Sequence, residues 1–320
     1  MEHADDDHYA SIVEKLAGGR MIPFLGAGAN LCDRGDEEWV PGGPFLPSGG
    51  ELARHLVTRG RYPEPEEQDL PRVSQFLDVA RGEDELYLYL HEVFGESYEP
   101  TSLHRLLGQF ARFLGEKGLP QLVVVTTNYD DLVEQALEAE GLEFDLVWYE
   151  AKHQSAQRGR FLHRSPGKKT VPIARPNKYA GLPIVLERPA ILKLHGCLDR
   201  RSVTGDSYVI TEDSYIDYLS GGDVGGLIPI ALWNRLTSAS LLFLGYALRD
   251  WNLRVILNRI WGTRTLVGKS WAIQREPADP AASRIEQTLW EARENVELVY
   301  CELGEYVRQI KTRLPIAEPA

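Results

Sequence analysis

Cysteine is scarce in this chain. Its 320 residues include three cysteines, Cys32, Cys197 and Cys301, which are widely spaced and form no C-x-x-C pair. A zinc site built from four cysteines is therefore excluded, and no H-E-x-x-H or similar ligand spacing replaces it. We expect no catalytic metal. A sparse, odd number of cysteines is typical of a reducing compartment.

Long apolar stretches are also absent from the sequence. No run reaches the about 18 apolar residues that a membrane-spanning helix needs. The acidic start, Met1–Asp7, lacks the apolar core of a signal peptide. We therefore expect a cytoplasmic protein with no membrane partner.

An excess of positive charge is missing as well. The net charge is −12, whereas sequence-independent binding of nucleic acid needs a basic face that releases counterions. We expect no tight, direct binding of nucleic acid. One local stretch is basic and is either a solvated loop or a contact for a phosphate or a partner. It contains Arg158, Arg160, His163, Arg164, Lys168, Lys169, Arg175 and Lys178.

Apolar runs alternate with amphipathic segments along most of the chain. The runs at 21–25, 122–126, 191–194 and 240–245 are typical of strands buried on both faces. Helical periodicity fills most of the intervals between them. This alternation predicts an α/β fold, with a Rossmann-like parallel sheet flanked by helices.

Two segments do not follow that alternation. Residues 48–98 carry three helical patterns, at 48–60, 70–81 and 83–95, with no strong strand signal, and predict a small helical subdomain inserted into the core. Residues 150–189 are polar, basic and rich in proline and glycine, and predict a flexible loop. The Rossmann-like core then covers about 9–35 and 100–314 of a single domain, 1–320.

A glycine turn follows the first strand. Gly26, Ala27 and Gly28 come directly after Met21–Leu25, and glycine leaves backbone N–H groups open to a pyrophosphate at a helix start. The third glycine of the usual dinucleotide fingerprint is missing. A purely structural tight turn therefore remains the alternative.

Polar residues follow the second strand. Thr127, Asn128 and Asp130 come after Leu122–Thr126. An asparagine both donates and accepts hydrogen bonds, so Asn128 is suited to a ribose hydroxyl or a water, and Asp130 to a carboxamide N–H. The alternative is that either residue only caps the helix that begins near residue 131.

A histidine follows the third strand. His195 and Gly196 end the run Ile191–Leu194, at the edge where α/β sheets bind their ligands. Histidine moves protons near neutral pH, and Gly196 leaves room for a ligand. A core histidine with satisfied hydrogen bonds is the alternative. Cys197 lies too close along the chain to form a nucleophile–base pair with it.

The strand at 240–245 ends in a fourth candidate contact. Gly245 closes the strand, and Arg249 lies on the turn that follows. Arg249 either faces a phosphate or pairs with an acid such as Asp250. Together, the strand ends predict a site that binds and cleaves a nucleotide.

In order along residues 20–250, these segments resemble the sirtuin (silent information regulator) superfamily. Its motifs are similar to Gly26–Gly28, Pro100–Arg105, Thr127–Asp130, His195–Gly196 and Gly245–Leu248. The zinc cysteines of sirtuin deacetylases and their Gly-Ile-Pro-Asp-Phe-Arg stretch are absent. Thr127–Asp130, Ile210–Tyr215 and Leu244–Asp250 look like the zinc-less, sirtuin-like domains of bacterial antiphage defence systems.

The resemblance implies that NAD⁺ is the substrate and is hydrolysed to nicotinamide and ADP-ribose. Asn128 and His195 would be catalytic, with Asn128 holding ribose or water and His195 acting as general base. The implied NAD⁺ contacts are Gly26, Ala27, Gly28, Asn30, Thr127, Asp130, Gly245 and Arg249.

The sequence leaves two other functions open. One is an NAD⁺-dependent protein deacylase or ADP-ribosyltransferase, and the other is a module that senses NAD⁺ or ADP-ribose without turnover. The resemblance also implies a homo-oligomer, a separate sensor or regulatory protein of the same defence system, or both.

Overall fold

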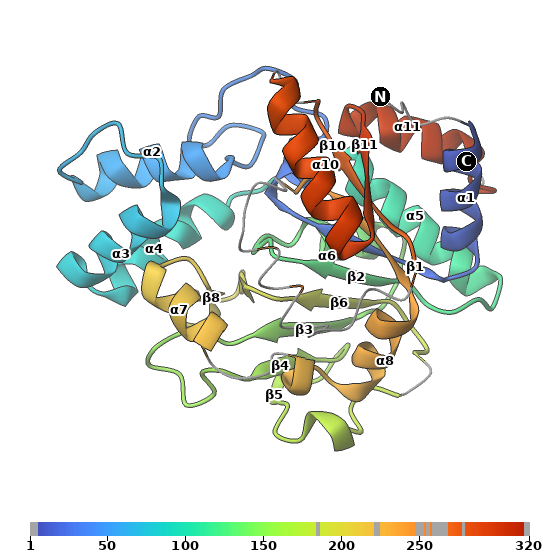
Figure 1. The fold of residues 1–320 in the computed structure, drawn as a ribbon. Coiled ribbons are helices and arrows are strands. Elements are labelled where there is room, and N and C mark those ends of the chain that lie inside the picture. Colours follow the sequence, from blue (N-terminus) through green and yellow to red (C-terminus); the bar gives the residue numbers. More distant parts are fainter. Residues whose placement is uncertain are drawn as a thin grey trace.

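A central sheet organises the molecule. The computed structural model describes residues 6–183, 186–220, 225–246, 268–276 and 279–316, together with Leu253 and Leu257. In these residues the sheet has nine strands in the order β11-β10-β9-β1-β2-β6-β3-β4-β5 (Figure 1). The strands are β1 (Met21–Leu25), β2 (Val123–Thr126), β3 (Asp145–Tyr149), β4 (Phe161–Arg164), β5 (Val171–Pro172), β6 (Ala190–Lys193), β9 (Ser240–Leu244), β10 (Ser270–Gln274) and β11 (Val296–Tyr300).

The strands from β11 to β3 are all parallel, as the sequence predicts. Every residue of β1, β2 and β9 is buried, because helices cover both faces of a parallel sheet. In this sheet β4 is antiparallel to β3, and β5 is antiparallel to β4. The expected loop over 150–189 is therefore wrong in part, since this range adds two strands to the edge of the sheet at β3.

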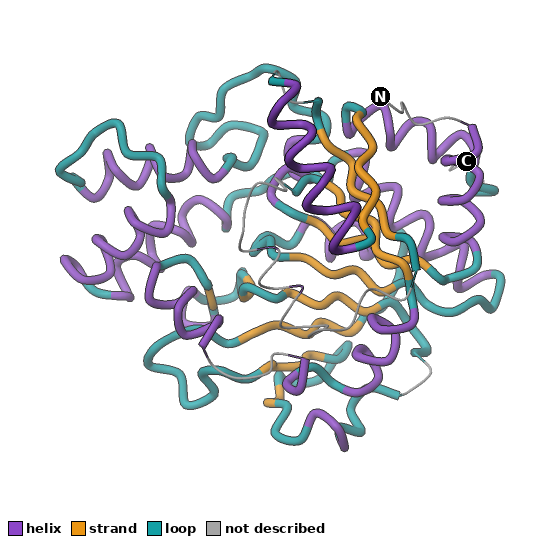
Figure 2. The backbone as a smooth tube through the Cα atoms, viewed as in Figure 1, coloured by secondary structure: helices purple, strands orange, loops and turns teal. Residues whose placement is uncertain are grey.

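Helices form a layer on each face of the sheet (Figures 1 and 2). Residues of β1 alternate between the two layers: Met21 and Leu25 face one cluster, and Ile22 and Phe24 face the other. The first cluster includes α1 (Asp6–Ala17), α5 (Ser102–Glu116), α6 (Leu132–Ala139) and α11 (Leu303–Arg313). The second includes α7 (Glu212–Ser220), α8 (Ile230–Ser238) and α10 (Pro280–Glu294). No helix in the described part of the chain is long and apolar enough to cross a membrane.

The predicted helical insertion is present at one side of the sheet (Figure 1, left). It consists of α2 (Gly49–Gly60), α3 (Leu70–Arg81) and α4 (Glu83–Phe94) and has its own apolar cluster. A reciprocal capping box between Ser48 and Glu51 fixes where α2 begins. A small hairpin, β7 (Gly196–Cys197) and β8 (Ser207–Tyr208), packs against the insertion through Tyr208.

Candidate active site

A cavity of about 850 Å³ lies at the carboxyl ends of β1, β2 and β9 and beside His195. β2 and β6 lie on one side of β1 and β9 lies on the other, so the chain changes direction in the sheet at this point. Open α/β sheets bind ligands at such a switch point, and the volume suits a nucleotide. The cavity is lined by the predicted residues Ala27, Gly28, Asn30, Thr127, Asn128, Asp130, His195 and Gly245.

Two predicted residues are not in that lining. Gly26 lies just behind it, and its carbonyl accepts a hydrogen bond from Nδ2 of Asn128 at 3.1 Å. Arg249 lies outside the described residues, as do its neighbours Ala247 and Asp250.

The glycines after β1 and β9 let two loops approach each other closely. The N–H of Gly28 donates to the carbonyl of Gly245 at 2.8 Å, and the N–H of Gly26 donates to Leu244 at 3.0 Å. A Cβ on Gly26 would lie 2.7 Å from that Gly245 oxygen, and Gly245 itself has a φ of +72°. The expectation that these glycine N–H groups are open to phosphate is therefore wrong for this structure. Contact between the two loops requires the glycines.

A chain of hydrogen bonds joins the loops after β1 and β2. Nδ2 of Asn128 donates to Oδ1 of Asn30 at 3.3 Å, and Nδ2 of Asn30 donates to Oδ2 of Asp130 at 2.7 Å. The other oxygen of Asp130 accepts from the N–H of Leu132 at 3.2 Å. The side chain of Asp130 thus bonds one N–H in the first turn of α6, where Asp131 occupies the N-cap position, and the side chain of Asn128 bonds none there. Oδ1 of Asn128 accepts no hydrogen bond from the described residues, although Asn128 lines the cavity.

Thr127 links the loop after β2 to the loop after β9. Its hydroxyl lies 2.6 Å from the hydroxyl of Tyr246, which follows Gly245. The ring of Tyr246 packs edge-on against Phe24 of β1. The carbonyl of Tyr246 accepts from Nε2 of Gln274 at 2.6 Å. These contacts place two hydroxyl groups beside the glycine loops, where a polar ligand would reach them.

His195 is buried in an aromatic pocket at the end of β6. The side chain is 5% exposed, and the rings of Tyr215 and Tyr218 lie edge-on to the imidazole at 5.4 and 5.3 Å. Nε2 of His195 is buried with no hydrogen-bond partner in the described structure. Burial alone lowers the pKa of His195 to about 3, so the ring is neutral at pH 7. A buried, neutral imidazole nitrogen beside a cavity fits a ligand that donates a hydrogen bond.

The neighbours of His195 have structural roles. Gly196 has a φ of +103°, and a Cβ there would lie 2.0 Å from the carbonyl oxygen of Ser207. Pairing of β7 with β8, and not room for a ligand, therefore requires this glycine, which corrects the sequence interpretation. The Cys197 thiol donates to the carbonyl of Leu198 at 3.2 Å, and burial raises its pKa to about 12. A buried, protonated thiol is not a nucleophile.

Sequence reasoning missed two parts of the cavity wall. One comes from the insertion and the segment before it: Pro47, Leu52, Pro71 and Phe94. No signal in the sequence indicates that these helices face the site. The other part comes from the ends of β10 and β11: Gln274, Arg275, Cys301 and Glu302. The strand-end rule that selected Asn128 and His195 would have found these residues too.

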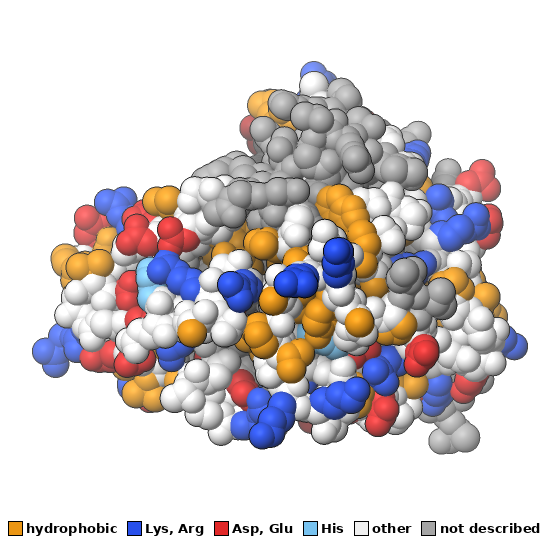
Figure 3. Space-filling view, turned by 90° about the horizontal axis from the view of Figure 1, so that it is seen from below, with side chains coloured by type: hydrophobic (Ala, Val, Ile, Leu, Met, Phe, Trp, Pro, Cys, Tyr) orange, Lys and Arg blue, Asp and Glu red, His pale blue; other side chains and the backbone are white. Residues whose placement is uncertain are grey.

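The basic stretch lies apart from the cavity, and its face is seen from below the sheet in Figure 3. Arg158 pairs with Asp217. The other exposed cations form no ion pair with the described residues: Arg160, Lys168, Lys169, Arg175 and Lys178. No group of three or more His, Cys, Asp or Glu residues within the described ranges is arranged to hold a metal ion.

The fold and the site together define a Rossmann-like α/β protein with a nucleotide-sized cavity at the switch point of its sheet. Residues 122–299 match the family model of the SIR2-like domain. This match covers more than half of the chain, and the chain belongs to the SIR2-like family. The sequence-based assignment to this family is confirmed.

Curated relatives carry names that indicate NAD⁺ hydrolysis and defence. The chain is 27% identical over 262 residues to "NAD(+) hydrolase ThsA" of Acinetobacter baumannii (strain 532279), covering 81% of this chain and 43% of that protein. It is 22% identical over 247 residues to "Defense-associated sirtuin 2" of Bacillus subtilis, covering 77% and 20%. A second protein named "NAD(+) hydrolase ThsA", from Cytobacillus dafuensis, is 26% identical over 203 residues, covering 63% and 32%. The chain thus spans less than half the length of each relative.

Proposed function

We propose that this chain hydrolyses NAD⁺ to nicotinamide and ADP-ribose. The observation that carries the proposal is that two residues lining one cavity, His195 and Asn128, each have a side-chain atom with no hydrogen bond from the described residues: Nε2 of His195 and Oδ1 of Asn128. Oδ1 of Asn128 accepts hydrogen bonds, as does Nε2 of His195 in the tautomer that carries its proton on Nδ1, and ribose hydroxyls and water donate them. The names of the relatives from Acinetobacter and Cytobacillus support the same substrate and reaction.

The roles proposed for Asn128 and His195 imply one orientation of NAD⁺ along the strand ends. The ribose that carries nicotinamide lies at the ends of β2 and β6, beside Asn128 and His195. The pyrophosphate then crosses the loops after β1 and β9, near Thr127 and Gly245, with Arg249 as a further phosphate contact. The adenosine extends toward the ends of β10 and β11, because neighbouring strands are about 4.8 Å apart and the cavity continues in that direction.

The reaction breaks the bond between C1′ of the ribose and the pyridinium nitrogen. Nicotinamide leaves with the bonding electrons as a neutral molecule, and a water oxygen bonds to the cationic carbon. The proton of that water becomes strongly acidic as its oxygen bonds to the sugar, so even a weak base such as His195 accepts it. General-base assistance of this kind contributes about 10²–10⁴-fold.

Asn128 holds the ribose or the attacking water in this scheme. Its Nδ2 bonds to Gly26 and Asn30 fix the amide plane and direct Oδ1 as the free acceptor. Asp130 holds Asn30 in place and binds the nicotinamide carboxamide once NAD⁺ displaces one of its present contacts.

We further propose that the chain acts in the cytoplasm as an NAD⁺-depleting effector of bacterial antiphage defence. Its activity would be controlled by homo-oligomerisation, by a separate sensor or regulatory protein of the same system, or by both. The printed name of the Bacillus subtilis relative supports a role in defence.

Product analysis tests the proposed function. The purified chain is incubated with NAD⁺, alone and with the products of neighbouring genes, and nucleotides are separated by chromatography. We expect nicotinamide and ADP-ribose in equal amounts. O-acyl-ADP-ribose formed with an acyl-lysine peptide would indicate a deacylase instead. Binding of NAD⁺ or ADP-ribose with no product under either condition would indicate a sensing module.

A further inference from the structure

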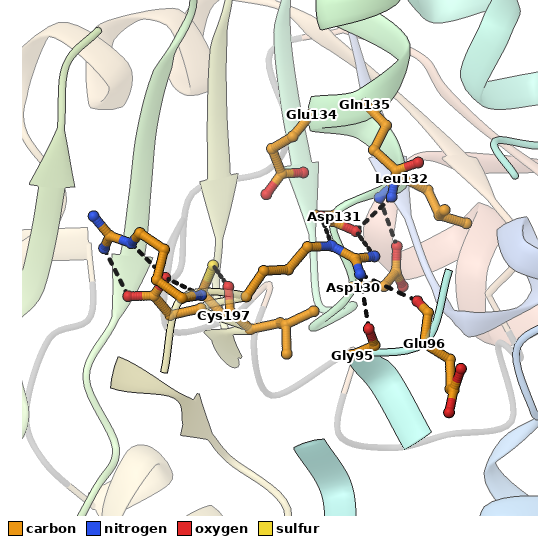
Figure 4. Close-up of polar contacts among 12 residues, drawn as sticks. Gly95, Glu96, Asp130, Asp131, Leu132, Glu134, Gln135 and Cys197 are labelled. Atoms are coloured by element: carbon orange, nitrogen blue, oxygen red, sulfur yellow. Dashed lines mark hydrogen bonds and ion pairs between the residues drawn. The ribbon is translucent and has the colours of Figure 1, made fainter. Parts of the chain in front are cut away.

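Arg200 joins three segments of the chain through a single guanidinium group. Its Nε and Nη2 donate to the two carboxylate oxygens of Asp131, the latter at 2.7 Å. Its Nη1 donates to the carbonyls of Gly95 at 2.9 Å and Glu96 at 3.2 Å. Figure 4 shows Asp131, Gly95 and Glu96 converging on this group.

Each of these segments continues directly into the cavity. Gly95 and Glu96 follow Phe94, which ends α4 and lines the cavity. Asp131 follows Asp130 in the loop that carries Asn128. Arg200 itself follows the β7 segment that begins after His195. The N–H of Leu198 donates to the carbonyl of Tyr129 at 2.9 Å, which holds the second and third segments together.

The contacts of Arg200 suit an arginine specifically. The planar guanidinium binds a carboxylate in two places and still has N–H groups for other acceptors, which a lysine ammonium cannot reproduce. The carbonyls at the end of α4 lack partners within the helix and carry partial negative charge. Burial opposes ionisation of Asp131, but the hydrogen bonds and charge of Arg200 hold its pKa below the usual value.

We propose that Arg200 is a positioning residue that keeps the insertion wall and the Asn128 loop in register for NAD⁺ cleavage. The inference rests on the proposed function. Arg200 does not line the cavity, so it acts through the segments that it joins. The ring of Phe94 lies 5.4 Å from that of Tyr129 at the same junction, so a shift there moves the cavity wall and the loop together.

Arg201 provides a matched control. It is the next residue, carries the same side chain and also forms a two-point ion pair, in this case with Asp199 at 2.6 and 2.7 Å. That pair stays within one turn and joins no other segment. The side chain of Arg201 is 68% exposed, whereas that of Arg200 is 35% exposed.

The test compares Arg200→Ala, Arg200→Lys and Arg201→Ala by steady-state NAD⁺ hydrolysis in the full chain with its activator. We expect Arg200→Ala to lower kcat at least about 10-fold and to change KM less than about 3-fold, because Asn128 and His195 lose their mutual geometry. Arg200→Lys should have an intermediate kcat, and Arg201→Ala should stay within about 2-fold of wild type. A wild-type kcat in Arg200→Ala, an effect on KM alone, or an equal loss in Arg201→Ala would overturn the proposal.

Hydrogen exchange separates this proposal from the proposed function. Arg200→Ala should speed amide exchange in both 94–98 and 128–133, and Arg201→Ala in neither. If the wild-type protein does not cleave NAD⁺ with any activator, the proposed function fails, and exchange alone then tests the link. Faster exchange in one of the two segments, or in neither, would contradict a link between them.

Discussion

Two buried histidines lie toward opposite ends of the same sheet, and their surroundings differ. His163 of β4 is 2% exposed, with its Nε2 2.9 Å from Oδ1 of Asp145 and its Nδ1 2.8 Å from the hydroxyl of Tyr179. Arg188 binds the other oxygen of Asp145 at 2.8 Å. His195 is also buried, at 5% exposed, yet its Nε2 has no partner in the described structure.

The difference separates an end of the sheet where polar groups satisfy one another from the end that carries the cavity. Near the first residues of β3, polar groups satisfy one another, and burial costs little. At the carboxyl ends, His195 and Asn128 keep acceptors free beside a cavity, which lowers stability unless a ligand binds. His104 shows that a free nitrogen alone is not a site: its Nε2 is buried and unpartnered, but it does not line the cavity.

The largest effect is expected for His195→Ala. Removing the proton acceptor at the cavity should lower NAD⁺ turnover by about 10²-fold or more. Because the Nε2 of His195 makes no hydrogen bond in the described structure, the variant should remain folded. Turnover and melting temperature measured on one preparation test this. Turnover near the wild-type value would place the catalytic centre elsewhere.

Asn128→Ala should also lower activity more than stability. It removes the free Oδ1 acceptor and two Nδ2 hydrogen bonds, so we expect turnover to fall about 10²-fold and the free energy of unfolding by about 1–2 kcal/mol. Asn177→Ala, on the exposed turn Pro176–Lys178, is the control and should match wild type. Retained activity with a loss of stability would mean that Asn128 only joins the two loops.

His163→Ala should have the opposite pattern. It leaves Asp145 buried with one fewer hydrogen bond and creates a void, which should lower the free energy of unfolding by about 2–3 kcal/mol. The kcat of the folded fraction should not change, because His163 does not line the cavity. Urea denaturation and kinetics on the same sample measure both. A fall in kcat without a loss of stability would remove the distinction between the two ends.

A smaller effect is expected in the pH dependence of stability. The pKa of His195 is about 3 in the folded protein and about 6.5 when exposed, so below pH 6.5 the unfolded chain binds a proton that the native protein does not. The free energy of unfolding therefore falls as the pH is lowered through that window. Between pH 7.5 and pH 5, His195→Ala should lose up to about 2 kcal/mol less of this free energy than wild type. Denaturation curves at both pH values measure this. Equal losses in both proteins would mean that His195 is not buried as described.

The sequence identified the end of the sheet that carries the cavity because its signals are local. Apolar runs such as Leu122–Thr126 become parallel strands, and the carboxyl ends of parallel strands meet at one edge, so Asn128 and His195 share a cavity. What it missed depends on contacts distant in the sequence. Strands β4 and β5 are short and polar and form only against the edge of β3. Gly196 is needed because of Ser207, and Phe94 reaches the cavity only through packing of the insertion.

The central claim is that the orphaned acceptor of His195 serves NAD⁺ cleavage. Its most direct test is NAD⁺ turnover with product identification in wild type, His195→Ala and His163→Ala under one activating condition. We expect nicotinamide and ADP-ribose from wild type and from folded His163→Ala, and almost none from His195→Ala. Equal turnover in wild type and His195→Ala, or activity lost only in His163→Ala, would contradict the account.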